Sequence, residues 1–200
     1  MPKTGGSWVE HYLIHELGGT IYPDLPGHAP ALQIPEHVRK GKILFGTVRD
    51  PLSWYVSWYV HALSSPQSQK RLLVFGAGNT DFESVLRGAL FPRYDRCPDS
   101  PGVIWEVPPV ARRIYLGRSE SLYTWAFRYV YGGVQNFIPM EDLSNNLGEF
   151  LHLRVDTEKY LPRNTRSERK VETEVEYTDE LRELVLKRDG EIAKLLGYVS

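Results

Sequence analysis

The feature that most constrains the fold is a nearly continuous apolar run at residues 43–48, Ile-Leu-Phe-Gly-Thr-Val, which ends at Arg49-Asp50-Pro51. A strand without polar alternation is typical of a parallel sheet that helices cover on both faces. The polar residues and the proline end this strand, and the aromatic-rich stretch 52–63 that follows is predicted to be a helix. Strand, loop and helix in this order predict an α/β layered domain.

A glycine-containing loop opens the chain, as Met1-Pro-Lys-Thr-Gly-Gly-Ser-Trp8, directly before a predicted helix at residues 7–17. Such a loop favours phosphate or sulfate, because backbone N–H groups converge at a helix start and the helix dipole attracts an anion. Lys3 adds a positive charge. Arg49 and Ser57, which lie eight residues apart across a strand-to-helix junction, form a candidate second anion site.

These two segments resemble the sulfotransferases that use 3′-phosphoadenosine 5′-phosphosulfate (PAPS). The family's 5′-phosphosulfate loop reads approximately Pro-Lys-Thr/Ser-Gly, and its 3′-phosphate motif places a Ser eight residues after an Arg, as in this chain. The likeness continues through residues 137–143, 161–167 and 177–198, in the correct order. The resemblance therefore covers nearly the whole chain.

The resemblance implies one P-loop-like α/β domain over residues 1–200, with three layers and a central, mainly parallel sheet of about five strands. The strand that precedes the phosphate loop in this family has no counterpart before Pro2, which is a departure from the pattern. Residues 64–112 contain predicted loops, and we expect them to recognise the acceptor. Periodicity and capping signals predict the other elements, with helices at 30–40, 80–90, 119–131, 143–153 and 178–196 and strands at 20–22, 113–116 and 134–138.

The resemblance also implies roles for individual residues. Lys3 would neutralise the leaving 5′-phosphate, and His28 would take the acceptor proton, with Asp24, His11 and Glu10 as alternative bases. A sulfuryl group carries less charge than a phosphoryl group, so no metal is required. The nucleotide would contact Lys3, Thr4, Gly5, Gly6, Ser7, Trp8, Arg49, Ser57, Asn164 and Ser167. Trp8 could stack on adenine or belong to the core, and Asn164 and Ser167 could instead lie in an ordinary charged loop.

The implied activity is an enzymatic transfer of the sulfuryl group to a hydroxyl of a glycan or small metabolite, which leaves 3′,5′-adenosine bisphosphate. A net charge of −1 gives no general case for nucleic-acid binding. The single cysteine, Cys97, and the lack of a long apolar stretch fit a cytoplasmic protein without a membrane partner. A rival interpretation is a non-catalytic nucleotide-binding or interaction protein with the same fold. The loop lacks the spacing of nucleotide triphosphatases, which disfavours a nucleotide kinase.

Overall fold

The computed structural model describes residues 4–22, 29–64, 66–91, 120–153 and 175–199. Helices take 62% of these residues and strands take 6%. The chain divides into two compact units. We call residues 1–50 and 127–168 the sheet unit, and residues 51–126 and 169–200 the helical unit. The prediction of one domain over residues 1–200 stays a prediction.

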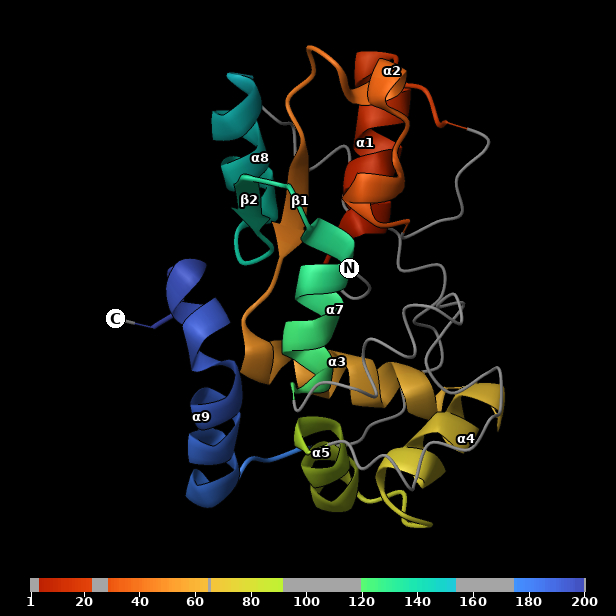
Figure 1. Cartoon of the computed structure of the whole chain (residues 1–200), viewed down its shortest axis with the longest axis vertical. Helices are drawn as coiled ribbons and strands as arrows, with labels where there is room; N and C mark the ends of the chain where they lie inside the picture. The colour runs from red at the N-terminus through yellow and green to blue at the C-terminus, as the bar shows by residue number, and fades with distance from the viewer. Residues whose placement is uncertain (1–3, 23–28, 65, 92–119, 154–174, 200) are drawn as a thin grey trace. The chain divides into compact units, whose positions relative to one another are not determined.

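The sheet unit contains two short strands that pair in parallel (Figure 1). In this pairing Phe45 lies beside Asn136 and Val48 lies beside Pro139. The described elements of the unit are α1 (Gly6–Leu17), η1 (Ala31–Gln33), α2 (Glu36–Arg39), β1 (Phe45–Val48), β2 (Asn136–Pro139), α8 (Leu143–Leu151) and the last turns of α7 (Leu122–Tyr131).

Helices cover both faces of the small sheet. Successive side chains of a strand point to opposite faces, so β2 contributes side chains to the packing on each side. On one face, α1 and α8 close a core around β2, made of Val9, Tyr12, Ile138 and Leu147. On the other face the ring of Tyr131 packs on Phe137, with ring centroids 5.8 Å apart. A side chain at Gly46 would collide with the Tyr131 ring, so glycine is needed there.

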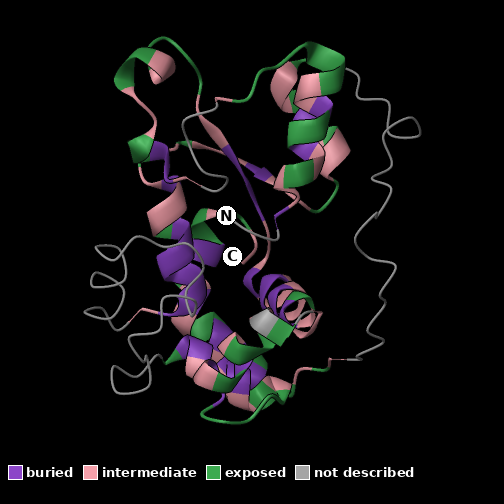
Figure 2. Ribbon diagram, turned by 90° about the vertical axis from the view of Figure 1, so that its right-hand side faces the viewer, coloured by how far each residue is buried: buried purple, intermediate pink, exposed green. Residues whose placement is uncertain are grey.

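The helical unit has an aromatic core. Its described elements are α3 (Pro51–Leu63), α4 (Pro66–Phe75), α5 (Phe82–Leu90), α9 (Asp179–Leu195) and the first residues of α7. Trp54 is fully buried and stacks on Trp58, with ring centroids 6.2 Å apart. Tyr55 and Tyr123 pack edge-to-face with the same indole, with ring centroids 5.1 and 5.4 Å from it. Figure 2 colours buried residues purple, and purple segments occur along the helices.

The predicted fold class is wrong. The described residues form one two-stranded parallel sheet and not a central, mainly parallel sheet of about five strands in a P-loop-like domain. Residues 20–22, predicted to be a strand, are not paired in a sheet, because a strand needs a neighbour for its backbone groups. The predicted strand at 113–116 lies outside the described residues.

Most predicted helices are confirmed, with changes that have local causes. The helix predicted at 30–40 is two short pieces, because Pro35 cannot continue the first piece. Residues 66–70, predicted to be loop, belong to α4, which starts with Pro66 at the first helical position, where proline is favoured. Helix α5 is capped by Asp81, whose carboxylate accepts the N–H of Ser84 at 2.8 Å, and not by Thr80.

Candidate functional site

The turn that starts α1 is the first part of the site. Gly5 has a left-handed backbone, with φ of 78°, and no side chain caps the helix here. The carbonyl of Gly5 accepts the N–H groups of Trp8 and Val9 at 3.0 and 3.2 Å, so these two donors are used within the turn. The earlier N–H groups of a helix have no partner inside it and suit an anion. The start of α1 can therefore bind an anion through Gly6 and Ser7.

Glycine at position 5 is required for two reasons. Its positive φ is strained for other residues, and an added Cβ would lie 2.8 Å from Leu143 Cδ2. Gly18, at the other end of α1, has a similar φ of 66° but no atom within 4 Å of an added Cβ. A side chain at Gly18 would therefore cause backbone strain alone, whereas a side chain at Gly5 would cause backbone strain and a steric clash.

The side chain of Thr4 fixes the turn to the sheet. Its side chain is buried, and its Oγ1 lies 3.2 Å from Oγ1 of Thr47 in β1. The hydroxyl of Tyr131 donates to the carbonyl of Thr47 on the same strand. Burial raises the pKa of Tyr131 to about 12, although hydrogen bonds with Thr4 and Thr47 oppose the rise, so this phenol stays a neutral donor. The exposed hydroxyl of the predicted loop is that of Ser7.

Trp8 packs into the sheet unit. Its ring stacks on Tyr12 with a centroid distance of 5.7 Å and an interplanar angle of 6°. It also packs against the core of Val9, Ile138 and Leu147. This placement fits the core interpretation of Trp8, and any contact with adenine would use the half-buried remainder of the ring.

Arg49 follows β1 directly and is half-buried. The next residue, Asp50, donates its backbone N–H to Oε1 of Glu141 at 3.2 Å. Glu141 lies in the turn after β2, and Asn146 holds that turn by donating to the carbonyls of Pro139 and Glu141 at 3.1 and 2.6 Å. Because parallel strands end at the same edge, the loop with Arg49 and the turn with Glu141 lie side by side.

The carboxyl end of β1 thus gathers the predicted residues of the sheet unit. Thr4 contacts Thr47 one residue before the end of β1, and Arg49 follows that end directly. The turn that starts α1 and Arg49 are therefore both attached to the carboxyl end of β1. Ser57 lies in α3 of the helical unit. Four predicted residues, Lys3, His28, Asn164 and Ser167, lie outside the described residues, and so does the alternative base Asp24. Glu10 and His11, the other alternative bases, are exposed on α1.

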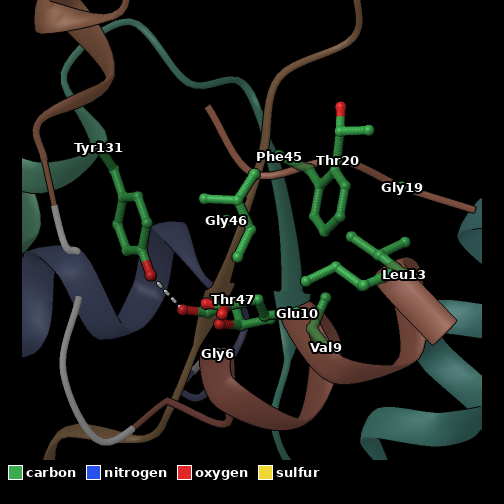
Figure 3. Close-up of a pocket in the computed structure, with 12 residues that line it drawn as sticks. Gly6, Val9, Glu10, Leu13, Gly19, Thr20, Phe45, Gly46, Thr47 and Tyr131 are labelled. Atoms are coloured by element: carbon green, nitrogen blue, oxygen red, sulfur yellow. Dashed lines mark hydrogen bonds between the residues drawn. The ribbon is translucent and has the colours of Figure 1, made fainter. Parts of the chain in front are cut away.

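A pocket of about 450 Å³ lies in the sheet unit between α1 and β1 (Figure 3). Figure 3 shows Glu10, Val9 and Leu13 of α1 on one side of β1 and Tyr131 on the other. The pocket is lined by Gly6, Val9, Glu10, Leu13, Ile14, Gly19, Thr20, Ile21, Phe45, Gly46, Thr47 and Tyr131. Among the described lining residues, Glu10 is the one that carries a charge, and most of the others are apolar.

A buried carboxylate in the helical unit was missed by sequence reasoning. Asp189 of α9 is fully buried and accepts hydrogen bonds from Tyr55 at 3.0 Å, Thr124 at 2.6 Å and Ser121. Burial raises the pKa of Asp189, and the three hydroxyl donors oppose that rise. The available signal was its position on the face of α9 that also carries Val185 and Ile192.

Among the described residues, no group of three or more His, Cys, Asp or Glu side chains could hold a metal ion. Within the same part of the chain, no helix has the length and apolar character needed to span a bilayer. Comparison of the chain with family models, curated proteins and solved structures gave no match.

Proposed function

We propose that this protein binds PAPS and transfers its sulfuryl group to a hydroxyl of a small molecule or glycan. The observation that carries the proposal is the uncapped start of α1, where Gly5 leaves no room for a side chain and Thr4 ties the turn to β1. Arg49 follows the same end of β1. An anion-binding helix start next to a guanidinium suits a nucleotide with two separate phosphate groups.

Most of the predicted residues have a role in this proposal. Gly6 and Ser7 would bind the 5′-phosphosulfate through backbone N–H groups, and Lys3 would neutralise the phosphate that leaves. Arg49 would hold the 3′-phosphate, with Ser57 as its proposed partner, and Asn164 and Ser167 would contact the nucleotide. The acceptor hydroxyl would give its proton to His28 while its oxygen forms a bond to sulfur and the bond from sulfur to the phosphate oxygen breaks.

Glu141 is a positioning residue in this proposal. Its carboxylate accepts the N–H of Asp50, so it holds the backbone that carries Arg49. A cytoplasmic location remains part of the proposal and is supported by a single cysteine, Cys97, which fits a reducing compartment. The rival function is nucleotide binding without turnover, which uses the same turn and the same arginine.

The proposal is tested by titrating Arg49→Ala with 3′,5′-adenosine bisphosphate and with AMP. A lost charge-assisted hydrogen bond of about 1.5–3 kcal/mol predicts roughly 10- to 100-fold weaker binding of the bisphosphate and little change for AMP. Lys42→Ala is the matched control, because Lys42 is an exposed cation shortly before β1. An equal loss of affinity for the bisphosphate and for AMP would show that Arg49 does not bind the 3′-phosphate.

Turnover separates the enzyme from its rival. PAPS and a panel of hydroxyl acceptors should give 3′,5′-adenosine bisphosphate with the wild-type protein. Lys3→Ala should bind the bisphosphate but lose most of the rate, because its charge is needed as the phosphate leaves. Binding without turnover for any acceptor would favour the non-catalytic protein.

A further inference from the structure

The exposed face of α1 carries two histidines, His11 and His15, one helical turn apart. Side chains four residues apart on a helix lie one above the other on the same face and are neighbours. The two imidazole rings are in contact, with ring centroids 4.2 Å apart and an interplanar angle of 47°. Because both residues are exposed, a ligand can reach the pair from solution.

The opposite face of α1 holds the helix against the sheet. Val9 and Tyr12 are each 5% exposed and share a core with Ile138 and Leu147. Tyr12 also stacks on Trp8, one turn before it on the helix. Since these buried contacts fix the helix, the two histidines are already side by side and no change of the backbone is needed to bring them together.

A histidine pair with this spacing suits one metal ion. Helices bind zinc through histidines at positions i and i+4, because each ring can turn one nitrogen towards a common point. With metal–nitrogen bonds of about 2.0–2.1 Å, the ring centroids of such a chelate lie about 4.5–5 Å apart. The observed separation of 4.2 Å is close to this value, so small rotations of the two side chains suffice.

The charge around the pair favours a cation. Helix α1 contains two glutamates, Glu10 and Glu16, and no lysine or arginine. His15 lies in the last turn of the helix, where the helix dipole is negative and attracts positive charge. The two ends of α1 therefore attract opposite ions, with an anion favoured at Gly6 and Ser7 and a cation favoured at His15.

We propose that His11 and His15 together bind one divalent transition-metal ion of the class that prefers imidazole nitrogen, which comprises Ni²⁺, Cu²⁺ and Zn²⁺. Each neutral ring gives one nitrogen lone pair to the ion, and water or other donors take the remaining positions. Resident zinc sites use three or four protein ligands, so a site with two holds an exchangeable ion. Mg²⁺ and Ca²⁺ prefer oxygen ligands and should bind poorly here.

The test is a calorimetric titration of the protein, without an affinity tag and without nucleotide, with NiCl₂. A saturable site of one ion per chain is expected, and MgCl₂ should not compete for it. His11→Ala and His15→Ala should each weaken binding by roughly tenfold or more, because loss of a mere supporting group already costs about 10- to 100-fold in metal affinity. His37→Ala is the matched control, because His37 is exposed on α2 and has no histidine three or four residues away.

A spacing variant distinguishes chelation from binding by two independent histidines. The double substitution His15→Gln with Glu16→His keeps two histidines on α1 but moves the second to a different face of the helix. It should lose as much Ni²⁺ affinity as His15→Ala. Both replaced residues are exposed, so the fold should be retained, which circular dichroism checks. In NMR spectra, paramagnetic Ni²⁺ should broaden the ring signals of His11 and His15 before those of His37.

The outcomes that would overturn the proposal are specific. They are the lack of saturable Ni²⁺ binding, full affinity in the spacing variant, and an equal loss of affinity in His37→Ala. Competition by MgCl₂ would assign the ion to carboxylates and would overturn the proposal as well. The metal titration contains no nucleotide, so its failure and the failure of the proposed function are distinguishable.

Discussion

The two units treat polar groups in opposite ways. In the helical unit, Asp189 is surrounded by hydroxyl donors from Tyr55, Ser121 and Thr124. In the sheet unit, the start of α1 has no side-chain cap, and the first helical residues Gly6 and Ser7 are half-buried and exposed. Buried polar groups whose hydrogen bonds are all made stabilise a fold. Backbone N–H groups at a helix start that have no partner inside the helix can instead bind a ligand. We therefore expect the helical unit to contribute most to the stability of the protein and the sheet unit to bind the ligand.

The largest expected effect is on the aromatic core of the helical unit. Trp54→Ala removes a fully buried indole that contacts three other aromatic rings, and such truncations cost about 3–5 kcal/mol. Thermal or urea unfolding measures the loss. Trp8→Ala in the sheet unit should cost less, because Trp8 is half-buried. An equal or larger loss for Trp8→Ala would break the proposed division between the units.

Asp189→Ala should come next, because it leaves three buried hydroxyls without their acceptor. The expected loss is about 1–3 kcal/mol in the free energy of unfolding. Glu191→Ala is the control, since Glu191 is exposed on the same helix. A cost no greater than that of the control would show that the cluster does not stabilise the unit.

The same carboxyl group predicts a pH dependence. The folded pKa of Asp189 lies above its ordinary value of 3.8, so the folded state holds the proton more tightly than the unfolded state. Its contribution to stability is therefore full below that value and is lost as pH rises through the folded pKa. Urea unfolding across this range should show the fall, and Asp189→Asn should flatten it. An unchanged profile in Asp189→Asn would assign the dependence to other groups.

The glycines at the two ends of α1 test the binding role of the sheet unit. Each substitution by alanine should cost about 1–2 kcal/mol of backbone strain. Gly5→Ala should also displace the turn, because its Cβ meets Leu143, and should weaken nucleotide binding more than tenfold. Gly18→Ala should leave binding intact. Parallel calorimetric titrations measure both, and equal affinities in the two variants would exclude the turn from the site.

The smallest expected effect is that of Glu141→Gln. The amide oxygen can still accept the N–H of Asp50, but the hydrogen bond loses its charge and about 0.5–1 kcal/mol. The expected result is a two- to fivefold weaker affinity for the bisphosphate, with no change for AMP. Glu149→Gln, on α8, is the exposed control. A change in AMP affinity would mean that Glu141 acts on more than the backbone next to Arg49.

The local elements could be read from the sequence better than their assembly. The apolar run at 43–48 predicted β1, and the periodic face with Leu181, Val185 and Ile192 predicted α9. The number of strands depends on partners distant in the chain, which periodicity does not report. Residues 20–22 show this clearly, since two of the three, Thr20 and Ile21, are β-branched, yet they pair with no strand in the described part of the chain.

The site was predictable in part for the same reason. Glycines before an amphipathic helix predicted the turn at α1, and its φ of 78° at Gly5 and its missing cap are consistent with that role. The sequence predicted Thr4 as a ligand contact, and the structure adds that its hydroxyl lies 3.2 Å from Oγ1 of Thr47. Only tertiary contacts could show this. The buried cluster at Asp189 was also missed, because an aspartate in a charged helix is usually solvated.

The central claim is that the sheet unit binds a nucleotide with two separate phosphate groups. Calorimetric titration of the purified protein with 3′,5′-adenosine bisphosphate, with AMP and ATP as controls, tests it most directly. We predict selective micromolar binding of the bisphosphate, equivalent to about −8 kcal/mol. No binding, or equal binding of all three nucleotides, would contradict the claim.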